Sequence, residues 1–234
     1  LLAYPEALYE TEHLANANKR KKEYEDFLAT NIFENPDDVN NIRKLKEFGC
    51  FRSNSVLTTE NFLSSREAEA SILSYSTFLN NHQLVLKVVE DFGDPSQKLK
   101  YTPQLESGEF TAVPCIFEPK HVDSGNKPFF TSANFNYSTD GWTLNGEKSS
   151  VLISPEHKNS TMFLVVASIE IVDHIGDIKD GVGAFLVDGS LPGVTITGVD
   201  KTVGYDEKVF NQVTVSFKDV VLDKCKLKHL IVIR

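Results

Sequence analysis

The chain has 234 residues, of which 41% are hydrophobic and 24% charged, and these proportions are typical of a globular protein with a packed core. Its formal net charge of −9 argues against non-specific nucleic-acid binding, which requires a basic surface. No apolar run approaches the roughly 20 residues that span a bilayer, so no transmembrane segment is expected.

Three cysteines, Cys50, Cys115 and Cys225, are widely spaced and form neither a CxxC pair nor a Cys/His cluster. This spacing indicates reduced, mostly buried thiols in an intracellular compartment. The acidic segment at 173–177 contains Asp173, His174 and Asp177, but an exposed hairpin loop is a simpler interpretation than a metal site. We therefore predict no metal ligands.

The first part of the chain carries helical patterns. Residues 6–32 form a charged amphipathic stretch, and its basic run at 19–22 is interpreted as a solvated helix face, with a docking patch for an acidic partner as the alternative. Asn35 can cap a second helix, Pro36 suits its first position, and Gly49 is its expected end.

Further helices are expected up to residue 108. One begins at Thr58 or Thr59 and is interrupted at residues 80–81. The next, at 82–92, is almost wholly apolar and should lie inside a bundle. A short helix at 96–105 follows. The pattern predicts an all-α helical bundle.

After Phe110 the period of the apolar residues changes to that of strands. Asp140-Gly141 and Asn145-Gly146 are typical hairpin turns, because both central positions of a type I′ turn need positive φ. Eight apolar or alternating runs are expected to be strands: 112–117, 129–137, 142–144, 151–153, 162–171, 182–187, 194–199 and 212–222.

The predicted fold class is therefore α+β. An N-terminal all-α helical bundle at residues 1–110 precedes an antiparallel, barrel-like β-domain at residues 111–225.

Five segments follow one another in an order and spacing that resemble the acyl-CoA dehydrogenases. The segments are residues 97–109, Glu118-Pro119, 141–148, 184–194 and 215–220. The resemblance extends from about residue 40 to 224. It is greatest to the long-chain mitochondrial branch, which includes a member that doubles as an assembly factor for respiratory complex I.

The resemblance implies a helical domain, a middle β-domain and a C-terminal four-helix domain, with FAD bound between the last two. In this family a glutamate removes the α proton of a fatty acyl-CoA while the flavin accepts the β hydride. Residues 226–234 would begin the C-terminal region, and its helical domain is expected to be absent. With it would go the usual base, half of the flavin site and the main tetramer interface, so no catalytic residue is predicted.

The match is poorest where the resemblance places the ligands. Phe117 stands in place of a threonine that contacts the flavin, and Ser150 in place of a tryptophan beside it. Phe117, Glu118 and Ser150 are therefore the candidate cofactor-binding residues, as a vestigial flavin cleft. Glu118 has a second interpretation as a structural turn carboxylate.

Two further segments diverge. Asp123 and Ser124 replace part of a glycine-serine-acid segment that approaches flavin and thioester, and they are the candidate substrate-binding residues. The loop at 203–207 carries Asp206 and Glu207 in place of an arginine-glycine-serine loop, which removes a positive charge and adds two negative ones.

These observations lead to two hypotheses. In the first, the chain is a catalytically degenerate acyl-CoA dehydrogenase-like scaffold for mitochondrial respiratory complex I assembly, and binds no cofactor. In the second, it is a fragment of an FAD-dependent acyl-CoA dehydrogenase that oxidises long-chain fatty acyl-CoA. Whether the chain is an enzyme is left open. By resemblance we expect protein partners, a mitochondrial location in the matrix or at the inner membrane, and homo-oligomers formed through the C-terminal domain.

Overall fold

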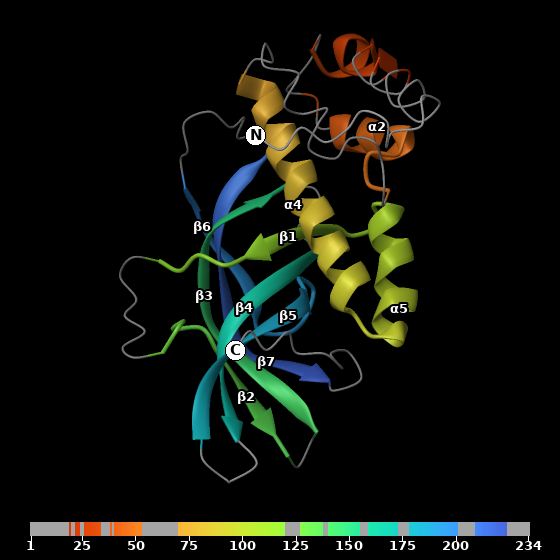
Figure 1. The fold of residues 1–234 in the computed structure, drawn as a ribbon. Coiled ribbons are helices and arrows are strands. Elements are labelled where there is room, and N and C mark those ends of the chain that lie inside the picture. Colours follow the sequence, from red (N-terminus) through yellow and green to blue (C-terminus); the bar gives the residue numbers. More distant parts are fainter. Residues whose placement is uncertain are drawn as a thin grey trace, which may run out of the picture.

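The computed structural model describes residues 19, 22–23, 26–33, 38, 40–52, 70–119, 127–137, 140–154, 159–172, 178–200 and 209–223. The helices are η2 (Ala29–Phe33), α2 (Asn41–Phe48), α4 (Ala70–Phe92) and α5 (Pro95–Glu106). The strands are β1 (Thr111–Cys115), β2 (Ser132–Asn136), β3 (Gly141–Ile153), β4 (Thr161–Val172), β5 (Ile178–Asp188), β6 (Val194–Asp200) and β7 (Asn211–Asp223). Figure 1 shows the helices on one side of the sheet, with α4 crossing β1.

The seven strands form one mixed sheet. One edge of β4 pairs with β5 in antiparallel register, and its other edge pairs with β1 and then with β2, both in parallel register. The sheet continues from β2 through β3 and β7 to β6 in antiparallel register. The α+β class is confirmed, but the sheet is mixed rather than antiparallel, because β1 and β2 share one neighbour and run in its direction.

The predicted turn at Asn145-Gly146 is wrong, because β3 runs straight through it. The register against β7 shifts between Leu144 and Gly146, which marks an irregularity of the β-bulge kind. The Asn145 side chain explains why the strand continues. Its Oδ1 accepts the backbone N–H of Asp219 at 2.8 Å, and its Nδ2 donates to Asp219 Oδ1 at 3.2 Å, so this amide joins β3 to β7.

A hairpin does join β2 to β3, with Asn136 opposite Gly141. Asp140 takes the left-handed conformation, with φ of 52°, while Gly141 is already the first residue of β3. The predicted hairpin is therefore confirmed, but Gly141 belongs to the strand and not to the turn.

The helices confirm one predicted boundary and correct another. Gly49 ends α2 with φ of 92°, and its N–H donates to the Lys46 carbonyl at 3.0 Å. Asn35, Pro36, Thr58 and Thr59 lie outside the described residues. The interruption expected at residues 80–81 is wrong, since α4 is continuous there. An asparagine inside a helix costs only a few tenths of a kcal/mol more than a good helix former, and packing outweighs that cost.

Residues 82–92 of α4, which were predicted to lie inside a bundle, are buried on some faces and exposed on others. Leu84 and Phe92 are 49% and 54% exposed, so only part of the helix surface is buried. One buried cluster joins α4 and α5 to the sheet through Ala112 and Met162. A second cluster packs the preceding helices and Phe78 against Phe210, and a third fills the sheet itself. Among the helices that the structure describes, none combines the length and apolarity that crossing a bilayer requires.

The two described cysteines are free and buried, as expected. Burial raises the pKa of Cys50 to about 12 and also raises the pKa of Cys115 above its ordinary value. Cys225 lies outside the described residues.

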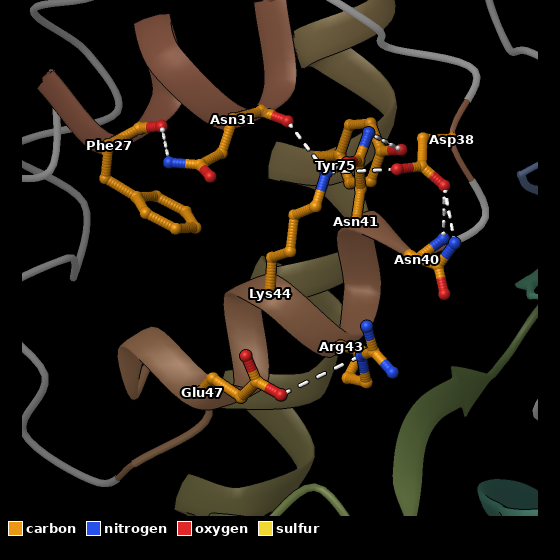
Figure 2. Close-up of polar contacts among 9 residues, drawn as sticks. All are labelled: Phe27, Asn31, Asp38, Asn40, Asn41, Arg43, Lys44, Glu47 and Tyr75. Carbon is orange, nitrogen blue, oxygen red and sulfur yellow. Dashed lines mark hydrogen bonds and ion pairs between the residues drawn. The ribbon is translucent and has the colours of Figure 1, made fainter.

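Lys44 ties the first helices together. Its Nζ donates to the carbonyl of Asn31 at 3.3 Å, to Asp38 Oδ2 at 3.0 Å and to Asn41 Oδ1 at 3.1 Å, as Figure 2 shows. The buried Asn41 also donates to the hydroxyl of Tyr75 on α4, at 3.1 Å. The backbone N–H of Asn40 and then the ammonium of Lys44 lower the pKa of Asp38 to about 2.

We expect Lys44→Met to lower the Tm by roughly 2–6 °C, because three hydrogen bonds are lost around buried Asn41. The matched control is Arg43→Met, which removes only an exposed pair with Glu47 whose nitrogen–oxygen distance is 3.8 Å. Such pairs contribute little, so its Tm should stay within about 2 °C of the parent. Thermal unfolding followed by circular dichroism measures both, and equal Tm values for the two variants would contradict this role for Lys44.

Candidate functional site

The carboxylate of Glu118 joins three stretches of chain. Its Oε2 accepts the backbone N–H of Phe130 at 2.8 Å, and its Oε1 accepts that of Thr131, also at 2.8 Å. Oε1 also accepts a hydrogen bond from Lys148 Nζ on β3, at 3.0 Å. This geometry matches the interpretation of Glu118 as a structural carboxylate.

Lys148 is fully buried. Besides Glu118, its Nζ donates to the carbonyl of Ile116 at 3.1 Å and lies 4.3 Å from the centre of the Phe129 ring. The ammonium is thus surrounded by a carboxylate, a carbonyl and an aromatic face, all of which favour a cation.

Burial and hydrogen bonding shift the pKa values of Glu118 and Lys148 in opposing ways. Burial raises the pKa of Glu118, but hydrogen bonds from the N–H groups of Thr131 and Phe130 and from Lys148 outweigh it, and the net pKa lies below its ordinary value. Burial lowers the pKa of Lys148, and the Glu118 carboxylate offsets only part of that effect.

Phe117 and Ser150 lie beside this ion pair. The Phe117 carbonyl accepts the backbone N–H of Ser149 at 2.9 Å, which attaches the segment after β1 to β3. Ser150 is exposed, with φ of 58°, where the register of β3 against β7 shifts between Lys148 and Val151. The structure therefore brings the three candidates Phe117, Glu118 and Ser150 into one region, and their part in binding a flavin stays a prediction.

Three apolar residues of the segments around the ion pair have exposed side chains. Phe117 is 70% exposed, Phe130 48% and Ile116 40%. We call these three residues the apolar rim; they belong to the two segments that the Glu118 carboxylate joins, since Ile116 and Phe117 precede Glu118 and the N–H of Phe130 donates to it.

The backbones of β3 and of the segment before β2 approach each other closely in the same region. Gly146 has φ of 139°, and a Cβ atom there would lie 2.5 Å from the Cα of Thr131. Thr131 is fully buried, and its hydroxyl donates to the Glu147 carbonyl at 3.2 Å. Only glycine fits this close approach.

The other sequence candidates lie outside the described residues: Asp123, Ser124, the loop at 203–207, and Asp173, His174 and Asp177. Among the residues that the structure does describe, no group of three or more His, Cys, Asp or Glu side chains could hold a metal ion. Sequence reasoning missed the pairing of Lys148 with Glu118, because that pairing depends on the segment after β1 lying against β3.

Several known proteins are similar to this chain in sequence or in fold. No family model matches it. The very long-chain specific acyl-CoA dehydrogenase of Bos taurus mitochondria is 34% identical over 152 residues, which are 63% of this chain and 22% of that protein. A probable acyl-CoA dehydrogenase of Bacillus subtilis is 27% identical over 223 residues, 84% of this chain and 34% of that protein.

The chain is similar in sequence to acyl-CoA dehydrogenases. It spans about a fifth to a third of the length of these relatives. Solved structures share its fold: an acyl-CoA dehydrogenase of Bacillus anthracis complexed with FAD has a TM-score of 0.65 at 22% identity, with 97% of this chain and 38% of that chain covered. Butyryl-CoA dehydrogenase of Megasphaera elsdenii has a TM-score of 0.66 at 18% identity, with 90% and 57% covered.

Lys148→Met should destabilise the protein by roughly 3 kcal/mol, because it leaves the Glu118 carboxylate without its cation. The double variant Glu118→Gln/Lys148→Met should recover part of that loss, since no ion is left unpaired. Urea unfolding measures each free energy.

The matched control is Lys127→Met, which removes a pair with Glu170 whose side chains are 42% and 52% exposed. Its effect should stay below about 1 kcal/mol. If Lys148→Met and Lys127→Met cost the same, the buried pair does not organise this region.

Proposed function

We propose that this chain is a catalytically degenerate acyl-CoA dehydrogenase-like protein that serves as a binding or assembly scaffold. One observation carries the proposal. The ion pair and backbone contacts that position Phe117 and Ser150 are intact, whereas the two side chains themselves are unsuited to a flavin.

The fit to FAD fails at both positions. Phe117 carries no hydroxyl group, and its backbone carbonyl already accepts the N–H of Ser149. Ser150 offers a short, exposed hydroxyl where the resemblance implies an indole ring. Loss of an aromatic stack forfeits roughly 0.5–1.5 kcal/mol beyond its buried area, and loss of the threonine removes a polar contact as well. No step through a flavin is derived for this chain.

The apolar rim suits a protein partner. Exposed aromatic and aliphatic side chains grouped around a rigid centre are typical of interaction surfaces. Resemblance to the branch that includes a complex I assembly factor supports an assembly role in mitochondria, in the matrix or at the inner membrane. The mitochondrial relatives agree with that location.

The second candidate is an FAD-dependent acyl-CoA dehydrogenase that acts on long-chain fatty acyl-CoA. The 34% identity to a very long-chain specific enzyme favours it. The side chains at positions 117 and 150 are the observation against it, because they lie within the described region.

Titration of the purified protein with FAD, followed by flavin fluorescence, tests the proposal. We expect no saturable binding at micromolar FAD. In the double variant Phe117→Thr/Ser150→Trp, the affinity should rise by roughly 2- to 12-fold, the equivalent of one aromatic stack, while acyl-CoA should still not bleach the flavin. The matched control Phe130→Thr removes an exposed phenyl of the same apolar rim and should leave FAD affinity unchanged. Stoichiometric binding by the parent protein, or bleaching by the double variant, would favour the dehydrogenase.

A further inference from the structure

His82 is a fully buried residue in the middle of α4. Its Nδ1 accepts the backbone N–H of Ala112 on β1 at 3.0 Å. The imidazole is therefore neutral, with its proton on Nε2. This hydrogen bond joins the helical segment to the sheet at the place where α4 crosses β1 (Figure 1).

The surroundings of His82 are apolar. The Phe51 ring lies edge-on to the imidazole, with 4.7 Å between ring centres. Buried side chains of α4, α5 and β1 complete the enclosure, including Val85, Leu105 and Ala112. Nε2 has no hydrogen-bond partner among the described residues, and the Leu105 backbone, which raises the pKa of His82, does not outweigh the effect of burial.

Among the described residues, no charged group contributes to the pKa of His82. The titratable side chains on the elements around it are Tyr75, Lys87, Glu90 and Asp91 on α4, Cys50 and Arg52 after α2, Lys98, Lys100, Tyr101 and Glu106 on α5, and Cys115 on β1. The carboxylates and cations among them are exposed or half-buried. The one buried carboxylate nearby in sequence, Asp94, caps α5 twelve residues further along, about 18 Å away at 1.5 Å per helical residue.

A second proton on His82 would therefore be incompatible with this geometry. Nδ1–H would point at the Ala112 N–H, so two donors would face each other, and a cation would be buried without a counter-ion. Burial lowers the pKa of His82 from 6.5 to about 4. Because the folded pKa is depressed, the stabilising contact is fully present above pH 6.5 and is lost as the pH falls towards 4.

We propose that His82 is an acid-sensitive latch: protonation of its imidazole breaks the contact with Ala112 and undocks α4 and α5 from β1, while the rest of the sheet stays folded. The sheet has its own buried cluster, which does not include His82. The change is a proton uptake from water and needs no other reactant.

Hydrogen–deuterium exchange of the Ala112 amide, corrected for the intrinsic pH dependence of exchange, tests the latch in the parent protein. Its opening equilibrium should rise roughly 20-fold from pH 7 to pH 5. The Val215 amide, in the ladder between β3 and β7, is the internal reference and should keep its protection. Equal changes at Ala112 and Val215, or no change at Ala112, would overturn the proposal.

The variant His82→Gln adds a control, because a glutamine oxygen can accept the Ala112 N–H but does not titrate in this range. It should abolish the difference between pH 5 and pH 7 at Ala112. A variant that keeps the 20-fold pH response would show that another group is responsible. Neither result depends on whether the chain binds FAD.

Discussion

The buried ion pair between Lys148 and Glu118 is the constraint on which the candidate site depends. An ammonium with no exposure is tolerated only because a carboxylate, a carbonyl and an aromatic face surround it. The same carboxylate accepts the N–H groups of Phe130 and Thr131, so the end of β1, the entry to β2 and the middle of β3 meet at one point. The positions of Phe117 and Ser150 follow from this arrangement.

Local patterns predicted the secondary structure where local forces decide it. The strand alternation after Phe110 and the glycine at position 49 gave the right elements, since burial period and left-handed φ are readable from neighbours, except that the runs at 142–144 and 151–153 are one strand, β3. The failures involve distant partners. Asn145 continues its strand because its side-chain amide hydrogen-bonds to Asp219, which is far away in sequence. The parallel direction of β1 and β2 depends on their pairing with β4, which also follows later in the chain. The pairing of Lys148 with Glu118 was missed for the same reason.

For the candidate site, the sequence predicted which residues belong to it but not how they are arranged. Resemblance located Phe117, Glu118 and Ser150, and the fold brings them together, but the left-handed backbone of Ser150 and the role of Lys148 needed coordinates. Fold alone does not decide chemistry. A nitrososynthase from Micromonospora carbonacea shares this architecture with a TM-score of 0.66 at 15% identity, with 93% of this chain and 56% of that chain covered. The function must therefore be argued from the side chains that face the site, and our scaffold proposal rests on those at positions 117 and 150.

The flavin content of the protein isolated from the cells that make it tests this account most directly. Heat denaturation releases non-covalent flavin into the supernatant, where its fluorescence can be compared with the amount of protein. The account predicts that FAD is far below one per chain. A near-equimolar content would contradict it, because the side chains at Phe117 and Ser150 would then be variations within a working flavin site.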